Sequence, residues 1–279
     1  MEIIIAKTAG FCFGVERAVD LAFNTESIKP TFTLGPIIHN DSVVEKLKSK
    51  GIIPIETIED REIDTLIIRS HGVALEVYEQ AKEKDIYVID ATCPYVTKIH
   101  KLVQKYYEKG YKVIVVGNAT HPEIIGINGW ANNECMIIKD KDDTKFLELN
   151  KNEKYLVVSQ TTYKKQIVDE IISALTSGEY VFEYINTICS ATTERQEEAL
   201  EVAKQVDCMI VVGSSYSSNT QKLYEICKKE CEKTYCIANS SELDKQIFKG
   251  CSKVGLTAGA STPSDVISEI VEAIQSIDK

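Results

Sequence analysis

The sequence lacks any long run of apolar residues. Apolar segments such as 113–116 and 209–212 are far shorter than the roughly 20 residues that span a bilayer. The N-terminus begins Met1-Glu2-Ile3 and carries neither a basic leader nor a small-residue cleavage site, so we expect no signal peptide. These absences argue against a membrane protein and predict a cytoplasmic one without a membrane partner.

Positive charge is also scarce. The chain has 32 Lys and Arg against 42 Asp and Glu, which gives a formal net charge of −10 at pH 7. Proteins that bind nucleic acids need clustered cations to displace counterions from phosphates, and no basic stripe is evident in the sequence. We therefore expect no nucleic-acid partner. Hydrogen-bond donors around an anionic ligand would have to overcome the repulsion from the net negative charge of the chain.

The signs of a disulfide framework or a zinc site are missing as well. The nine cysteines are an odd number in a chain without an export signal, so we expect free thiols. No C-x₂-C pair occurs, and no cluster of His and Cys completes a zinc site. What remains is an ordinary globular composition, with 44% apolar and 27% charged residues among 279.

A threefold repeat runs along the chain. Each repeat has a short strand, a turn that contains a cysteine, a helix, and a second strand that ends at a glycine. The cysteine-to-glycine pairs are separated by 23, 24 and 24 residues: Cys12 with Gly35, Cys93 with Gly117, and Cys189 with Gly213. This regularity indicates three related structural units.

Alternating strands and helices predict an α/β fold with mostly parallel sheets. We expect three similar small α/β units around a pseudo-threefold axis and a central cavity, because ligands of parallel sheets bind at the carboxyl ends of the strands. The predicted units are residues 14–92, 93–188 and 189–279, and residues 1–13 are expected to join the sheet of the third unit.

Cys12, Cys93 and Cys189 lie in turns directly before a helix N-terminus, where the helix dipole favours the thiolate form. Three thiolates from distant loops suit an iron–sulfur cluster with one iron free for substrate, although such clusters usually take four cysteines. The remaining cysteines are better explained as small buried hydrophobic residues. They are Cys135, Cys208, Cys227, Cys231, Cys236 and Cys251.

Three of the four histidines, His39, His71 and His121, fall in polar loops that follow strands. Ring N–H groups donate to phosphate oxygens, as do hydroxyls, amides and helix N-termini. We therefore predict an anion site. Its further candidate donors are Ser217, Ser218, Asn219 and Ser261. His100 lies inside a predicted helix, and we interpret it as a structural, partly buried ring.

Glu123 follows His121 in the same loop and is the candidate acid. Partial desolvation near an anion and a cluster would keep its carboxyl protonated long enough to act as a proton donor. A hydroxyl of Thr161 or Thr162 would relay the proton.

Nine short motifs cover nearly the whole chain in order: residues 9–18, 38–40, 70–73, 90–94, 121–123, 160–162, 188–192, 217–219 and 257–261. Together they resemble the LytB family of 4-hydroxy-3-methylbut-2-enyl diphosphate reductases. One departure is Thr120, because the family commonly has glycine before the His-Pro-Glu motif. The loop that carries Glu123 therefore bears an additional Cβ.

The resemblance implies the last step of the non-mevalonate isoprenoid pathway, a two-electron reductive dehydroxylation that yields isopentenyl and dimethylallyl diphosphate. It implies one [4Fe–4S] cluster with Cys12, Cys93 and Cys189 as ligands and one open iron for the substrate's hydroxyl group. It also implies an external electron donor such as ferredoxin or flavodoxin. By position, Glu123 supplies a proton, Thr161 supports it, and the diphosphate is held by His39, His71, His121, Ser217, Ser218, Asn219 and Ser261.

Two other functions fit the same residues. An aconitase-like hydro-lyase would use a three-cysteine cluster as a Lewis acid without any redox change, so it would need no reductant. A non-enzymatic redox sensor that binds zinc or a cluster would not depend on Glu123.

Overall fold

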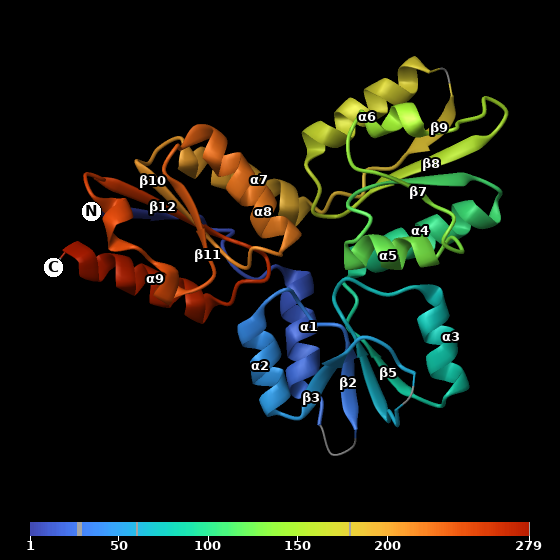
Figure 1. Ribbon diagram of the computed structural model, residues 1–279, viewed down its shortest axis with the longest axis horizontal. Helices are drawn as coiled ribbons and strands as arrows, with labels where there is room; N and C mark the ends of the chain where they lie inside the picture. The colour runs from blue at the N-terminus through green and yellow to red at the C-terminus, as the bar shows by residue number, and fades with distance from the viewer. Residues whose placement is uncertain (27–29, 60, 179, 279) are drawn as a thin grey trace. The chain divides into compact units, whose positions relative to one another are not determined.

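The computed structural model describes residues 1–26, 30–59, 61–178 and 180–278. These residues form three four-stranded parallel sheets that are flanked by helices (Figure 1). The predicted α/β class with three similar parallel sheets is therefore confirmed. In the part of the chain that the structure describes, no helix combines the length and the apolar character needed to cross a membrane.

The first sheet has the strand order β3-β2-β4-β5. Its strands are β2 (Thr31–Leu34), β3 (Ile52–Ile55), β4 (Thr65–Ile68) and β5 (Tyr87–Asp90). The helices of this part of the chain are α1 (Phe13–Asn24), α2 (Asp41–Ser49) and α3 (Leu75–Glu83).

The second sheet has the equivalent order β7-β6-β8-β9. Its strands are β6 (Lys112–Val116), β7 (Met136–Ile138), β8 (Lys154–Ser159) and β9 (Val181–Tyr184). The accompanying helices are α4 (Pro94–Glu108), α5 (Pro122–Gly129) and α6 (Lys165–Ser177), with a 3₁₀ turn, η1, at Asp143–Phe146.

The third sheet has the order β1-β12-β10-β11. Its strands are β1 (Glu2–Ile5), β10 (Cys208–Val212), β11 (Thr234–Ile237) and β12 (Lys253–Ala258). Its helices are α7 (Ser190–Ala203), α8 (Ser218–Glu230) and α9 (Ser264–Gln275), and three 3₁₀ turns follow Ile237: η2 (Ser240–Glu242), η3 (Lys245–Phe248) and η4 (Ser276–Asp278).

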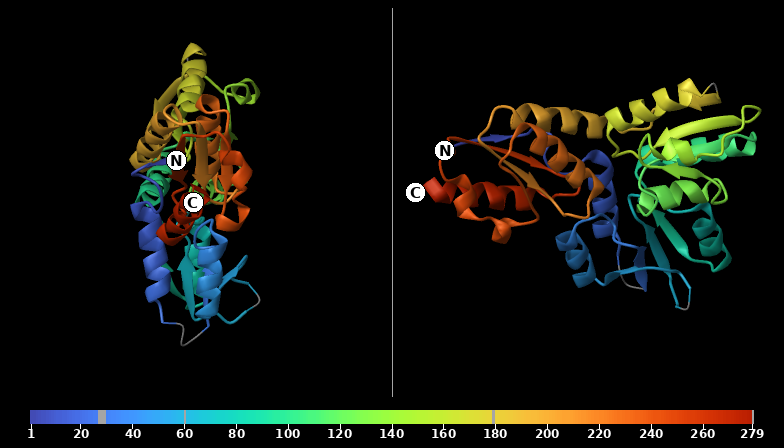
Figure 2. Two further views of the ribbon diagram at one scale, coloured as in Figure 1. Left: turned by 90° about the vertical axis from the view of Figure 1, so that its left-hand side faces the viewer. Right: turned by 45° about the horizontal axis from the view of Figure 1, so that its top comes forward.

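Strand β10 illustrates why the central strands are apolar throughout. Met209 and Val211 pack against α7 and α8 on one face, whereas Ile210 and Val212 pack against α9 on the other. In Figure 2, α9 (red) accordingly lies on the opposite side of this sheet from α7 and α8. Because successive side chains point to opposite faces, a strand covered on both sides reads as a continuous hydrophobic run.

Strand β1 takes the place in the third sheet that β5 and β9 take in the other two. It pairs in parallel with β12, with Glu2 opposite Lys253, and so forms an edge of the sheet. Each of these edge strands is followed by one of the three cysteine turns, at Cys12, Cys93 and Cys189. The fold therefore presents each of these cysteines in the same local setting.

The chain forms two compact units. Unit 1 comprises residues 1–16, 39–41 and 190–279 and holds the third sheet; unit 2 comprises residues 17–38 and 42–189 and holds the first two sheets. The predicted segments 14–92 and 93–188 each contain one sheet, and 189–279 contains three strands of the third sheet, which β1 completes. The division at these boundaries stays a prediction.

Candidate active site

The three cysteines predicted to bind a cluster have equivalent backbone contacts. Each is half-buried and lies directly before the first residue of a helix, α1, α4 or α7. Each backbone N–H donates to a carbonyl oxygen in the loop after the neighbouring strand: Cys12 to Ala260 (3.4 Å), Cys93 to Ser70 (2.9 Å) and Cys189 to Thr161 (3.0 Å). The recurring strand order thus repeats the same fixed turn in each sheet.

The turn before Cys12 is held by two charged residues of α7 that the sequence analysis missed. Arg195 is 3% exposed, and its guanidinium donates to the carbonyls of Thr8 (2.9 Å) and Gly10 (2.8 Å). The carboxylate of Glu198 accepts from the backbone N–H groups of Lys7 and Thr8, both at 2.8 Å. These bonds lower the pKa of Glu198 against the opposing effect of its burial. They fix the backbone that leads to the thiol.

The turn before Cys93 has its own arginine, which the sequence analysis also missed. Arg17 donates to the carbonyls of Thr92 (3.1 Å) and Asp90 (3.2 Å). The carboxylate of Asp90 accepts from the N–H of Thr92 (2.9 Å) and from the hydroxyl of Tyr78 (3.1 Å). The sequence does show Arg17 one turn into the helix that follows Cys12. The carbonyls that it contacts are distant in sequence, so its role was not evident.

Glu123 lies in the first turn of α5 and is 2% exposed. Both of its carboxyl oxygens contact Thr161: Oε1 accepts from the backbone N–H (2.6 Å), and Oε2 pairs with the hydroxyl (2.7 Å). Burial raises the pKa of Glu123 to about 7, although the two bonds from Thr161 act in the opposite direction. The carboxyl is therefore available in its protonated form near neutral pH.

The sequence left two threonines open as proton relays, and the relay role of either stays a prediction. Thr161 bonds to Glu123, whereas the hydroxyl of Thr162 accepts from the side-chain amide of Gln160 (3.1 Å).

His121 is the N-cap of α5, and its Nδ1 accepts from the backbone N–H of Glu123 (3.1 Å). Because this bond occupies the Nδ1 lone pair, the proton of the neutral ring lies on Nε2, which is then a donor. The ring of His71 packs edge-on against that of His121, with centroids 5.4 Å apart. Unit 2 therefore places two predicted anion donors beside the candidate acid.

Unit 1 contains the other predicted anion donors. The hydroxyl of Ser261 donates to the carbonyl of His39 (3.2 Å), and Tyr216 packs edge-on against the His39 ring at 5.7 Å. The hydroxyl of Tyr216 also donates to the carboxylate of Asp41. Tyr216 precedes the predicted donors Ser217 and Ser218, and the sequence analysis did not single it out.

Asn219 lies in the first turn of α8, which Ser217 caps by accepting from the N–H of Thr220 (3.4 Å). It is 5% exposed, and within the described residues neither Oδ1 nor Nδ2 has a hydrogen-bond partner. Burial of an unsatisfied amide costs about 1–3 kcal/mol. An anionic ligand at this helix N-terminus would satisfy the amide donor.

The predicted site residues thus form two sets. Unit 1 contains six of them, on the loops after β1, β2, β10 and β12 and in the first turn of α8: Cys12, His39, Ser217, Ser218, Asn219 and Ser261. In unit 2, Cys93, Cys189, His71, His121, Glu123 and Thr161 are joined by the contacts described above.

Three of the other cysteines, Cys208, Cys227 and Cys231, are buried as expected, whereas Cys135, Cys236 and Cys251 are only half-buried. Burial raises the pKa of Cys135, Cys208 and Cys227 to about 12, so these thiols are poor metal ligands.

His100 is 1% exposed and stacks on Trp130, with ring centroids 5.1 Å apart. Burial lowers its pKa to about 4, which fits the structural role inferred for it.

Thr120 is accommodated without a left-handed backbone, and its N–H donates to the side chain of Asn118 (3.1 Å).

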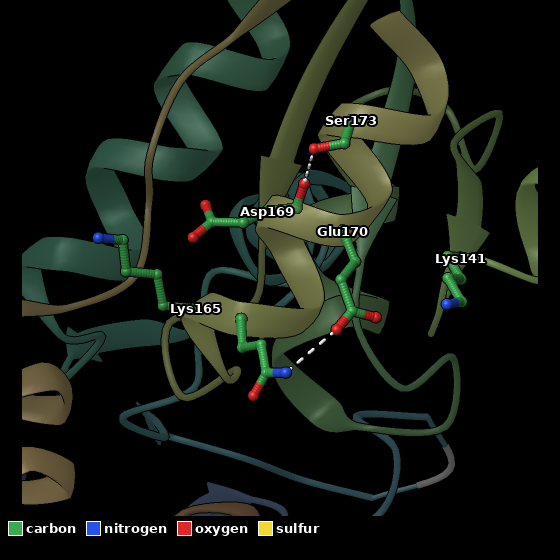
Figure 3. Close-up of a pocket in the computed structure, with 6 residues that line it drawn as sticks. Lys141, Lys165, Asp169, Glu170 and Ser173 are labelled. Atoms are coloured by element: carbon green, nitrogen blue, oxygen red, sulfur yellow. Dashed lines mark hydrogen bonds between the residues drawn. The ribbon is translucent and has the colours of Figure 1, made fainter. Parts of the chain in front are cut away.

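A surface pocket on α6, of about 580 Å³, contains none of the predicted site residues (Figure 3). Two hydrogen bonds join residues that line it: Gln166 donates to Glu170 (3.2 Å) and Ser173 donates to the carbonyl of Asp169 (2.8 Å). We assign it no role.

Comparison with known proteins gives a consistent result. A family model described as LytB protein matches residues 3–275. The 4-hydroxy-3-methylbut-2-enyl diphosphate reductase of Caldanaerobacter subterraneus subsp. tengcongensis is 44% identical over 283 residues, which cover 99% of this chain and 98% of the relative. The reductase of Clostridioides difficile is 43% identical over 282 residues, covering 99% and 100%.

Two solved structures are similar over almost the whole chain. The E-1-hydroxy-2-methyl-but-2-enyl-4-diphosphate reductase of Plasmodium falciparum has a TM-score of 0.92 at 33% identity, covering 97% of this chain and 87% of the other. An (E)-4-hydroxy-3-methyl-but-2-enyl diphosphate reductase, described as the terminal enzyme of the non-mevalonate pathway, has a TM-score of 0.71 at 41% identity, covering 99% and 100%.

Proposed function

The chain belongs to the LytB protein family, and we propose that it reduces 4-hydroxy-3-methylbut-2-enyl diphosphate to isopentenyl and dimethylallyl diphosphate. The reaction consumes two electrons and two protons and releases the hydroxyl group as water. This is the terminal step of the non-mevalonate pathway, as in the similar reductase of known structure. The enzyme is accordingly an oxidoreductase.

The observation that carries this proposal is the junction at Thr161. Its carbonyl accepts from the N–H of Cys189, while its own N–H and hydroxyl contact the carboxyl of Glu123. One residue therefore joins a candidate ligand turn to the candidate acid. Glu123 is held in one orientation, and its pKa of about 7 suits proton donation at neutral pH.

The diphosphate group is assigned to the polar loops. His71 and His121 of unit 2 offer ring N–H groups, and His121 is oriented by its bond from the Glu123 N–H. Unit 1 offers His39, Ser217, Ser218 and Ser261, with the buried amide of Asn219 at the start of α8. Donors of this kind stabilise phosphate oxygens through charge-assisted hydrogen bonds.

The residues present fit an iron–sulfur cofactor. Cys12, Cys93 and Cys189 are half-buried thiols in equivalent turns at helix N-termini. We propose that they hold one [4Fe–4S] cluster with one open iron, which when bound supplies the electron-transfer chemistry. The protein's own groups fix the turns, orient the diphosphate and donate the proton from Glu123.

The electrons must come from outside the chain, and we propose a one-electron carrier such as ferredoxin or flavodoxin as their source. An anaerobic assay with the diphosphate substrate and reduced methyl viologen tests the reaction itself. We expect two viologen cations oxidised for each product molecule. Loss of the substrate's hydroxyl group as water without consumption of any reductant would instead indicate a hydro-lyase.

Glu123→Gln tests the acid in the same assay. We expect kcat to fall by about 100-fold or more, because a positioned general acid contributes rate factors of this size. Glu148→Gln, at an exposed glutamate, is the matched control and should leave kcat unchanged. Equal kcat values for Glu123→Gln and the unaltered enzyme would reject the proton-donor role.

A further inference from the structure

The solvent face of α4 carries a short row of lysines. Lys98, Lys101 and Lys105 are exposed and spaced three and four residues apart, so they lie on one side of the helix. The helix has no acidic residue before Glu108, although the whole chain has a net charge of −10. A basic stripe of this kind was not expected from the sequence. We call this surface the α4 lysine face.

The opposite side of α4 is apolar and buried, so the lysine face has a fixed orientation. Val96, Ile99 and Val103 are 3% exposed or less. Within the described residues, none of the three lysine ammonium groups has a hydrogen bond or an ion pair. Their charges are therefore directed to solvent.

The lysine face begins one turn after Cys93, which is the N-cap of α4 (green in Figure 1). A pocket of about 500 Å³ at this end is lined by the cations Arg17, Lys98 and Lys101 and by Thr92 and Pro94, the two neighbours of Cys93. Its one carboxylate belongs to Asp90, whose oxygens already accept from Thr92 and Tyr78. The positive charge thus lies beside a candidate cluster ligand.

We propose that the α4 lysine face is the docking surface for the electron donor, and that this donor is an acidic ferredoxin. The inference rests on the proposed function, because only a reductase needs electrons from another protein. A ferredoxin with a single cluster carries one electron, so two reduced molecules of it must bind and leave in each turnover. Each is oxidised once, and the two electrons enter the reduction that releases the hydroxyl group as water.

Exposed charges suit such repeated, short-lived encounters. Complementary charge raises the association rate and orients the partner, whereas exposed ion pairs add little to the lifetime of the complex. Docking at the N-terminal end of α4 would bring the carrier to the Cys93 turn, which Arg17 holds in place.

The test compares two electron sources with the anaerobic holoenzyme. In the double variant Lys98→Glu and Lys101→Glu, we expect KM for ferredoxin to rise about tenfold at low ionic strength, with kcat at saturating ferredoxin within about twofold. Activity with reduced methyl viologen and KM for the diphosphate should stay unchanged. The difference in KM should shrink at high salt, because screening weakens exposed charges.

A matched double variant, Lys165→Glu with Lys229→Glu, adds the same charge at exposed positions on α6 and α8. An unchanged KM for ferredoxin in the α4 variant, or an equal rise in the matched variant, would overturn the proposal. If the α4 variant also loses viologen-driven activity, KM for ferredoxin is measured instead in the neutral double variant Lys98→Gln and Lys101→Gln. An unchanged KM in that variant would overturn the proposal. An unaltered enzyme that is inactive with both donors would instead refute the proposed function.

Discussion

The buried carboxyl of Glu123 gives the most quantitative prediction, which concerns stability and is independent of activity. Glu123→Gln replaces the acid by an isosteric amide that cannot ionise. The amide oxygen still accepts from the N–H of Thr161, and its NH₂ group donates to the Thr161 hydroxyl. The substitution therefore removes the ionisation and retains the packing.

The magnitude follows from the pKa of Glu123, which burial raises from 4.5 to about 7. A raised pKa means that the folded protein holds the proton more tightly than the unfolded chain. The stability that this supplies is fully present below pH 4.5 and is lost as the pH rises through 7. Relative to Gln, the ionised Glu123 should cost about 3 kcal/mol at high pH.

The assay is anaerobic urea denaturation followed by the fluorescence of Trp130, the one tryptophan of the chain, which lies at the end of α5 in unit 2. From about pH 5.5 to about pH 8.5, the difference in free energy of unfolding between Glu123→Gln and the unaltered protein should grow by about 2 kcal/mol in favour of the variant. Glu148→Gln, at the surface, is the control. A difference that does not change with pH would refute the reasoning, because no carboxyl with a raised pKa would then be titrating.

Cys93→Ser should lower the iron content of anaerobically purified protein, whereas Cys227→Ser, at a buried thiol within an apolar cluster, should not; iron lost only from the second would exclude Cys93 as a ligand. Gly72→Ala should destabilise the fold by about 2–4 kcal/mol, because the φ angle of Gly72 is +71° and the new Cβ would lie 2.4 Å from Cε1 of His100. Thermal denaturation measures this effect, and an unchanged melting temperature would contradict it. Arg195→Ala should lower the free energy of unfolding by about 1–3 kcal/mol and reduce the iron content, because the carbonyls of Thr8 and Gly10 lose their donor. Full iron loading of this variant would show that the Cys12 turn does not need Arg195.

The ends of three strands were predictable from the sequence. Gly35, Gly117 and Gly213 were expected to end strands, and β2, β6 and β10 end directly before them. Each is a short apolar or β-branched run between turn residues, and strands that are buried on both faces need only this local pattern. Nearly equal spacing between cysteine and glycine also indicated the three similar sheets.

The contacts within the site were less accessible to sequence reasoning. Glu123 and Thr161 were both singled out, but the bond between them depends on how β8 places its C-terminal loop beside α5. Arg195 illustrates the same limit, because a buried arginine on a helix looks like an ordinary solvated charge until its carbonyl partners, 185 and 187 residues away, are known. Side chains that act through distant backbone carry no local signature.

The pairing of β1 with β12 also affects the order in which the parts of the chain fold. During synthesis β1 emerges early, but the strand it pairs with, opposite Glu2 at Lys253, is made only after both sheets of unit 2. Until then the first strand lacks its native neighbour, and the N–H of Cys12 lacks its acceptor at Ala260. Because long-range pairing is slow, unit 1 should be the last part of the chain to fold, and its cysteine the last of the three to be positioned for a cofactor.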